Sequence, residues 1–368
     1  KLKPTVLHLA KWYPNKVEPL LGVFVRKHVL ATKNDFNHTV ISIYGTDAYE
    51  DEIVRIKSNY EGVEEVIYYY KKGIFTKMKV LYSVWKEMNS SSVALIHAHI
   101  ISWTSTLAYL HSLIYKTPYF ISEHWSGYHY KLFIKQNSFV KYFKRLSAKK
   151  AKMLLPVSQT LKRDMLASNI KASYKVIGNV VDGTVIDLPK NNKFTFICVG
   201  DLEQKHKNVN GILKAFSELD NNLNIQLDII GDGLDKQAYI ALNKTLNLSA
   251  SVNFHGAKSN TAVFEYLAKS HVLVLNSNYE TFSIICAEAL LSGIPVIATR
   301  CGGPEAFLNE QTGKLIDVGN TDQLIEAMKE IQNKYDAFKP AYLKEKAKAY
   351  SLSTIGTELA HNYKSVLS

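Results

Sequence analysis

Short apolar runs alternate with amphipathic segments along the chain. Runs rich in β-branched and aromatic residues predict buried strands, and apolar residues three or four apart predict helices. In the first half we predict strands over 5–10, 38–45, 65–70, 93–97, 118–122 and 153–157, and helices over 22–33, 74–88, 102–115 and 159–168. This alternation favours a mostly parallel sheet with helices on both faces.

The stretch 181–193 has no apolar period and mixes Gly, Pro, Asn and Lys, so we predict a linker there. The alternation then restarts, with strands over 194–200, 225–231, 252–254, 272–276, 295–299 and 314–316, helices over 208–219, 236–246, 260–269, 283–292 and 321–333, and a helical tail after Pro340 that is broken near 351–353. We therefore predict an α/β fold of two Rossmann-like, doubly wound domains facing a cleft, 1–185 and 186–345. Such sheets bind ligands at the carboxyl ends of their strands.

Composition narrows the class of protein. Of 368 residues, 46% are hydrophobic and 21% charged, which excludes a largely disordered or disulfide-stapled chain. The three cysteines, Cys198, Cys286 and Cys301, form no C-x-x-C pair, which favours a reducing compartment and opposes a zinc or iron–sulfur site. With neither a membrane-spanning stretch nor a signal peptide recognisable, we expect a cytoplasmic protein.

The segment 276–305 carries the strongest chemical signal. A strand ends near Asn276, Glu280 lies in the following loop, and a helix that contains Glu288 begins near Ser283. The free N–H groups at this helix start form an anion site suited to a diphosphate. Carboxylates on either side of it suit a sugar hydroxyl and a ribose. The alternative is that both glutamates are solvated surface residues.

This segment resembles the signature of the family 4 glycosyltransferases, which have the GT-B fold. Glu280 and Glu288 match the pattern E-x7-E, and 288–298 match E-A-x-x-x-G-x-P-V-x-A. The resemblance implies that Glu280 contacts the donor sugar and Glu288 the nucleotide ribose. Ser283 stands where the family often has Gly, and we expect it to cap the helix. The implied donor site also includes the residues at the helix start, Thr281, Phe282, Ser283 and Ile284.

A second segment, 194–208, also resembles the family. Gly200 follows a strand, and Lys207 stands at the position of the family lysine that contacts the donor diphosphate. The usual Arg is replaced by Asp201, which would repel a phosphate. Either Lys205 or His206 compensates, or the donor site is altered, or catalysis is weakened. We include Gly200, Lys205 and Lys207 among the donor-binding residues.

The first half matches the family more loosely. Gly22 lies where the family has a glycine loop near the donor phosphates, and His124 lies in a loop resembling the active-site histidine loop. A structural, hydrogen-bonded histidine is the alternative for His124. His97 and His99 form an H-x-H pattern without an evident third ligand, and we favour packing or acceptor contact. The GT-B resemblance also implies that the last segment, 346–368, packs back on the first domain.

Charge is concentrated in the first half of the chain. Residues 1–185 have a net charge of +14 and the remainder −2. The segment Lys131–Lys152 holds eight Lys or Arg and no acid, and in a helix its apolar residues Phe139, Tyr142, Phe143 and Leu146 would share one face. We interpret it as a surface for anionic lipid, at the inner face of the cell membrane. A core-packing stripe with a solvated basic face is the alternative, and nucleic acid is not expected.

Together these patterns predict a retaining glycosyltransferase with catalytic residues His124, Lys207 and Glu280. The expected donor is a nucleotide sugar, and the expected acceptor is a glycan or lipid-linked glycan of the bacterial envelope, as in lipopolysaccharide or capsule synthesis. No D-x-D motif is present, so we expect neither a metal nor another cofactor. Two alternatives remain open, a GT-B-shelled partner subunit with little activity and a nucleotide-sugar epimerase.

Overall fold

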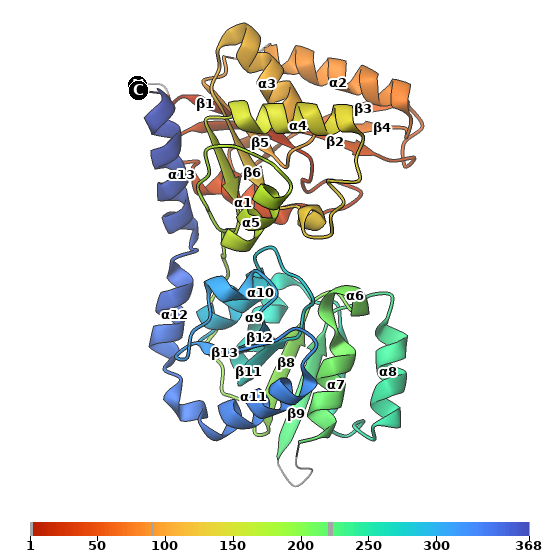
Figure 1. Ribbon diagram of the computed structural model, residues 1–368, viewed down its shortest axis with the longest axis vertical. Coiled ribbons are helices and arrows are strands. Elements are labelled where there is room, and N and C mark those ends of the chain that lie inside the picture. The colour runs from red at the N-terminus through yellow and green to blue at the C-terminus, as the bar shows by residue number, and fades with distance from the viewer. Residues whose placement is uncertain (1–2, 90–91, 220–223, 368) are drawn as a thin grey trace. The chain divides into compact units, whose positions relative to one another are not determined.

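The computed structural model describes residues 3–89, 92–219 and 224–367 (Figure 1). The chain divides into two compact units, one of Lys1–Val180 with Leu352–Ser368 and one of Val181–Ser351. We call them the N-unit and the C-unit. The division falls at Val180 where 185 was predicted, and the last segment begins at Leu352 where 346 was predicted. Helix α12 (Pro340–Lys348) stays with the C-unit because it packs against α10 (Ile284–Leu291).

The N-unit contains a seven-stranded sheet of order β3-β4-β2-β1-β5-β6-β7. Every pairing is parallel except that of β3 with β4. Six of the strands overlap predicted ones, and β3 was missed. The strands are β1 Thr5–Ala10, β2 Asn37–Gly45, β3 Ile53–Tyr60, β4 Val63–Tyr70, β5 Leu95–His99, β6 Tyr119–Glu123 and β7 Met153–Pro156.

Strand β3 was missed because it lies at the sheet edge with mostly exposed side chains, so it shows no apolar pattern. A two-residue turn joins it to β4. Both turn residues, Glu61 and Gly62, have positive φ, 50° and 90°. This conformation matches the twist of a hairpin. Asn59 closes the turn by accepting the Gly62 N–H at 3.0 Å.

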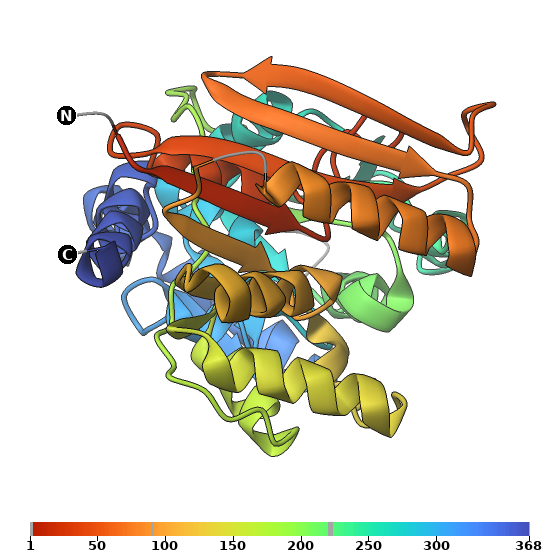
Figure 2. The same cartoon turned by 90° about the horizontal axis from the view of Figure 1, so that it is seen from above.

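Helices cover both faces of the N-unit sheet. Helices α2, α3 and α4 lie side by side on one face (Figure 2), where Trp85 packs on His111. Helices α1 and α13 pack together on the other face, and Gly356 permits this, because a Cβ there would lie 2.1 Å from the Ala31 carbonyl oxygen. The helices are α1 Val23–Ala31, α2 Ile74–Asn89, α3 Trp103–Tyr115, α4 Ser138–Lys150, α5 Gln159–Ala167 and α13 Leu352–Leu367, with a 3-10 turn η1 at Ser126–Tyr128.

The C-unit contains a parallel six-stranded sheet of order β10-β9-β8-β11-β12-β13. The chain runs outward from β8 in one direction and from β11 in the other. The boundary between β8 and β11 is therefore the topological switch point, where open α/β sheets bind ligands. The strands are β8 Phe194–Val199, β9 Ile225–Ile230, β10 Val252–Gly256, β11 Val272–Leu275, β12 Val296–Thr299 and β13 Gly313–Ile316.

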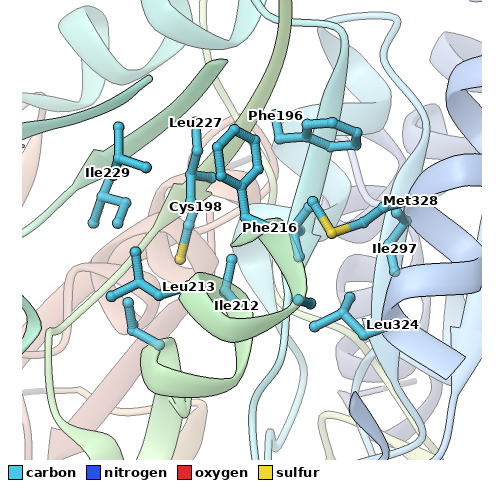
Figure 3. Packing of buried hydrophobic residues seen from close by; sticks show 14 of the residues in the cluster. Phe196, Cys198, Ile212, Leu213, Phe216, Leu227, Ile229, Ile297, Leu324 and Met328 are labelled. Carbon is cyan, nitrogen blue, oxygen red and sulfur yellow. The ribbon is translucent and has the colours of Figure 1, made fainter. Parts of the chain in front are cut away.

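The main core of the C-unit lies between this sheet and helices α7 and α11 (Figure 3). Phe196 and Leu227 of the sheet meet Phe216 of α7 and Met328 of α11, and burial of each such side chain contributes about 1.5–3 kcal/mol. The remaining helices are α6 Gln204–Lys207, α7 Val209–Ser217, α8 Lys236–Thr245, α9 Asn260–Lys269 and α11 Thr321–Asn333, with 3-10 turns η2 Pro304–Ala306 and η3 Tyr335–Ala337. The predicted α/β class with two Rossmann-like sheets is confirmed.

All three cysteines are free and buried. Burial raises the pKa of the Cys198 thiol to about 11, so this thiol stays protonated at neutral pH. The cysteines act as small apolar core residues. No helix in the described ranges combines the length and hydropathy needed to cross a bilayer.

Candidate functional site

The two C-unit segments singled out from the sequence meet at the switch point. The loop after β11 is hydrogen bonded to the residues around α6: Asn278 donates its backbone N–H to the His206 carbonyl at 2.8 Å and its side-chain amide to the Lys205 carbonyl at 2.9 Å. Asn276 donates to the Asn208 carbonyl at 3.1 Å. The asparagines thus fix one loop against the other at the carboxyl ends of adjacent strands.

Lys207 and Glu280 form an ion pair inside this junction. The Lys207 Nζ lies 2.6 Å from Glu280 Oε1, and the Ser277 hydroxyl donates to the same oxygen at 2.8 Å. Their side chains are 17% and 16% exposed, so the pair is largely shielded from water. Burial disfavours the charged ammonium, but the hydrogen-bonded carboxylate outweighs it and raises the pKa of Lys207. A fixed cation therefore stands at the switch point.

Gly200 makes room for this lysine. It follows β8 with a φ of 152°, and a Cβ at this position would lie 2.8 Å from Lys207 Cε. Any side chain there would displace the lysine stem. The glycine predicted as a donor-site residue therefore has a steric role visible in the structure.

The start of α10 lies in the next part of the same loop. Ser283 is the residue before the helix, and it adopts the left-handed conformation, with φ 70° and ψ 71°. Its hydroxyl donates to Cys286 Sγ at 3.2 Å and accepts no backbone N–H, so the expectation that Ser283 caps the helix was wrong. A serine that caps a helix usually has an extended backbone. Ser283 instead has the left-handed conformation that is typical of glycine, so its hydroxyl does not reach the free N–H groups of α10. The first turn carries no acidic residue, which suits an anion.

A tight turn supports the residues that precede α10. The backbone of Gly303 lies against Phe282, and a Cβ on Gly303 would come within 2.4 Å of the Phe282 carbonyl carbon. The Glu305 carboxylate accepts the Gly302 N–H at 2.9 Å. Phe282 itself is buried against Phe307, with ring centroids 5.0 Å apart. Phe282 is thus a packing residue, and Glu305 holds the turn.

The other predicted donor-site residues differ in exposure. Glu288 is buried in α10 and accepts from the Asn260 amide at 3.0 Å. Thr281 and Ile284 are partly exposed, whereas Lys205 and Asp201 are exposed. His206 lies 3.8 Å from Glu203. Asp201 therefore points its charge to solvent while Lys207 is paired within the C-unit.

Gly22 and His124 belong to the N-unit. Gly22 precedes α1 with a φ of 66°, and a Cβ there would lie 2.4 Å from the Trp12 carbonyl oxygen. His124 follows β6 and is only 6% exposed, with its ring 4.5 Å from Phe24. Burial lowers the pKa of His124 well below its usual value, so the imidazole is neutral at physiological pH.

The sequence analysis missed the part played by Glu123, which fixes the His124 loop. Its buried carboxylate accepts the backbone N–H groups of Ile101, His124 and Trp125, each at 2.9 Å, and the Tyr128 hydroxyl at 3.0 Å. Burial raises its pKa, and these hydrogen bonds act in the opposite direction. A carboxylic residue that ends a buried strand was the available signal for this role.

Three histidines from the neighbouring strands β1 and β5 lie close together in the N-unit. The ligand atoms of His8, His97 and His99 lie within 4.8 Å of one another, so these residues could hold a metal ion. The third ligand that the H-x-H pattern lacked is thus present as His8. However, His97 already bonds Tyr363 and Ser122, and His8 bonds His99 and His38. A metal would have to replace these hydrogen bonds.

Comparison with known proteins points to one family. The sequence model of the family described as glycosyl transferases group 1 matches residues 182–350. N-acetyl-alpha-D-glucosaminyl L-malate synthase of Bacillus anthracis is 35% identical over 132 residues, 34% of each chain. The Campylobacter jejuni N-acetylgalactosamine-N,N'-diacetylbacillosaminyl-diphospho-undecaprenol 4-alpha-N-acetylgalactosaminyltransferase is 31% identical over 210 residues, 54% of this chain and 55% of the relative. The chain thus matches between a third and just over half of the length of these relatives.

A solved structure shares the whole architecture. Anabaena HepE in complex with UDP superposes with a TM-score of 0.74 and 17% sequence identity, over 98% of this chain and all of that one. At this identity the likeness shows the fold. Both units of the chain therefore have counterparts in a single known architecture.

Proposed function

We propose that the chain, whose residues 182–350 match the sequence model of the glycosyl transferases group 1 family, transfers a sugar from a nucleotide-sugar donor to an acceptor glycan. One observation carries the proposal: Lys207 and Glu280 are paired at 2.6 Å at the switch point of the C-unit. This is where an α/β sheet binds ligands, and the two residues are those that the family resemblance assigns to the donor.

We propose that the donor diphosphate binds between Lys207 and the N-terminus of α10. The ammonium and the helix dipole both stabilise negative charge. Glu280 would then accept a hydrogen bond from a hydroxyl of the donor sugar, and Glu288 would accept hydrogen bonds from the ribose hydroxyls. The HepE structure was determined with UDP, which supports a nucleotide diphosphate as donor group. Gly200, Lys205, Thr281, Phe282, Ser283 and Ile284 are the proposed supporting residues of this site.

The proposed transfer retains the anomeric configuration. The bond from the sugar C1 to the diphosphate oxygen breaks, and the acceptor hydroxyl forms a bond to C1 from the same face. The acceptor proton passes to the departing diphosphate, whose charge Lys207 and the α10 N-terminus stabilise. These groups supply the positive charge, and no metal ion is required in this scheme. His124 and Gly22 are proposed to act from the N-unit, His124 as a neutral imidazole near the donor sugar.

The proposed acceptor is a lipid-linked or envelope glycan. The C. jejuni relative is named for a diphospho-undecaprenol acceptor, and other relatives are named for lipopolysaccharide synthesis. The basic surface 131–152 supports a location at an anionic membrane face. Phe139 and Tyr142 are 71% and 61% exposed, so this part of α4 is not a core-packing stripe. Each basic residue near anionic lipid contributes about 1 kcal/mol.

A panel of nucleotide sugars tests the proposal. Thermal shift identifies the donor, and release of the nucleoside diphosphate in the presence of lipid-linked glycans measures transfer. Binding with turnover supports the proposal. Binding without turnover for any acceptor would fit a partner subunit, and interconversion of free nucleotide sugars would fit an epimerase.

A further inference from the structure

Two lysines of the N-unit, Lys11 and Lys144, lie over the indole of Trp125, and a third, Lys77, acts on both electrostatically. Lys11 follows β1, Lys77 lies in the first turn of α2, and Lys144 lies in α4. The ammonium groups of Lys11 and Lys144 each lie 5.9 Å from the centre of the Trp125 ring. Lys11 also lies 5.5 Å from the Trp12 ring. We call the three lysines with Trp125 the lysine basin.

The basin has unbalanced positive charge. Among the residues that the structure describes, none of its three lysines forms an ion pair with a carboxylate within 4.0 Å. Lys144 donates instead to the neutral Gln136 amide oxygen at 2.8 Å. The carboxylate that faces Lys11 and Lys144 is Glu123, and its oxygens are engaged by backbone N–H groups and the Tyr128 hydroxyl.

The pKa values of Lys11 and Lys144 show that this arrangement is electrostatically unfavourable. Burial and the neighbouring ammonium groups lower the pKa of both Lys11 and Lys144, while Glu123 acts in the opposite direction. Partly buried cations without a direct ion-pair partner are unfavourable, and an anion bound among them would relieve the repulsion and form charge-assisted hydrogen bonds.

Exposed apolar side chains flank Lys77 in the first turns of α2. Ile74, Phe75 and Met78 are 72%, 78% and 63% exposed, and they flank Lys77 in sequence. Exposed apolar groups next to clustered cations fit a ligand that combines a phosphate with a hydrocarbon chain.

We propose that the lysine basin binds the phosphate groups of a lipid-linked acceptor. The hydrocarbon chain would lie on Ile74, Phe75 and Met78, and the acceptor sugar would extend along the Trp125 loop toward His124. This assignment rests on the proposed function and names its acceptor class, an isoprenoid-type phosphate or diphosphate ester. The loop that Glu123 holds in place would thus serve acceptor binding.

Binding of farnesyl diphosphate to the full chain tests the basin without requiring turnover. Tryptophan fluorescence is a direct readout because Trp12 and Trp125 lie at the basin. We expect Lys11→Gln and Lys144→Gln each to weaken binding about tenfold, as loss of one charge-assisted contact predicts. Lys116→Gln is the matched control: it removes an exposed N-unit charge outside the basin and should leave affinity unchanged. Equal affinity in wild type and both basin variants, or equal affinity for uncharged farnesol, would overturn the proposal.

Phosphatidylglycerol vesicles distinguish an acceptor phosphate from a lipid headgroup. If Lys11→Gln weakens vesicle binding but not farnesyl diphosphate binding, the basin is a headgroup site and the acceptor assignment is overturned. If Lys11→Gln weakens farnesyl diphosphate binding but not vesicle binding, the assignment of the basin to the acceptor phosphate is supported. Failure of the proposed function would look different: farnesyl diphosphate would bind through the basin, yet no donor sugar would be transferred to any acceptor.

Discussion

Lys207 donates to Glu280 across the switch point of the C-unit, at 2.6 Å and largely shielded from water. The pair joins the segment after β8 to the segment after β11, and Ser277 orients the carboxylate from the same loop. The carboxylate raises the pKa of Lys207 and so keeps the lysine charged. A donor that arrives with a diphosphate and hydroxyl groups would therefore meet a cation and an acceptor oxygen already held in position.

Glu280→Gln should lower both the rate of transfer and the free energy of unfolding. The amide preserves the shape of the side chain but loses the charge, so we expect transfer to fall by about ten- to hundredfold. Lys207 would lose its counter-ion, at a cost of about 1–3 kcal/mol in unfolding free energy. Steady-state kinetics and guanidinium unfolding measure the two effects. If unfolding free energy falls while transfer is unaffected, the pair is purely structural.

Ser283→Gly should stabilise the C-unit. A non-glycine residue in the left-handed region costs about 1 kcal/mol, and the serine side chain does not compensate by capping α10. We expect a gain of about 0.5–1 kcal/mol in denaturant unfolding. Ser283→Ala is the control, since alanine retains the strain and loses the contact with Cys286. A glycine variant less stable than the alanine variant would contradict this explanation.

Acid should destabilise the N-unit through its buried histidines. Burial lowers the pKa of His28 and of His38 to about 4, so both are neutral in the folded state. In the unfolded chain they bind protons below about pH 6.5, and stability is therefore lost as pH falls from 6.5 toward 4. Each such group lowers unfolding free energy by about 2 kcal/mol between about pH 7 and pH 5.

Urea unfolding at the two pH values measures this loss. His38→Gln should unfold with a smaller pH dependence than wild type, whatever its stability at pH 7. Lys57→Gln, an exposed N-unit change away from the histidines, should retain the full pH dependence. An unchanged pH dependence in His38→Gln would exclude His38 as a source of the effect.

Membrane association should depend on both charge and exposed aromatic residues. Binding to phosphatidylglycerol vesicles should weaken as salt is raised from about 0.1 M to 0.5 M, because the Debye length shortens from about 10 Å. Replacing Phe139 and Tyr142 by serine should reduce binding further, because both are exposed on α4. Co-sedimentation is the measurement. Comparable binding to neutral phosphatidylcholine vesicles would rule out the electrostatic component.

Most of the fold was predictable because buried parallel strands leave strong apolar runs. Strand β3 was not, because an exposed edge strand such as Ile53–Tyr60 has no core face to mark it. Its turn, Glu61–Gly62, also lacks the usual Asn or Asp before glycine. The hydropathy pattern thus predicts strands that are buried on both faces of the sheet, but it does not predict an exposed strand at the sheet edge.

The candidate site was predictable only in part. The spacing of Glu280 and Glu288 and the position of Lys207 marked two segments that the structure brings together, but sequence spacing cannot show that Lys207 and Glu280 pair across 73 positions. The capping role expected of Ser283 failed because a left-handed backbone turns its hydroxyl away. The third histidine beside His97 and His99 was hidden because His8 comes from a different strand.

The most direct test of the central claim is the affinity of the full chain for nucleoside diphosphates, measured by isothermal titration for wild type, Lys207→Gln and the control Lys236→Gln. Lys236 is a C-unit lysine paired with Asp232 at 2.8 Å and is not among the residues proposed to bind the donor. The account predicts that one nucleoside diphosphate binds, that Lys207→Gln weakens it about tenfold or more, and that Lys236→Gln leaves it unchanged. No binding of any nucleoside diphosphate, or equal binding by the Lys207 variant, would contradict it.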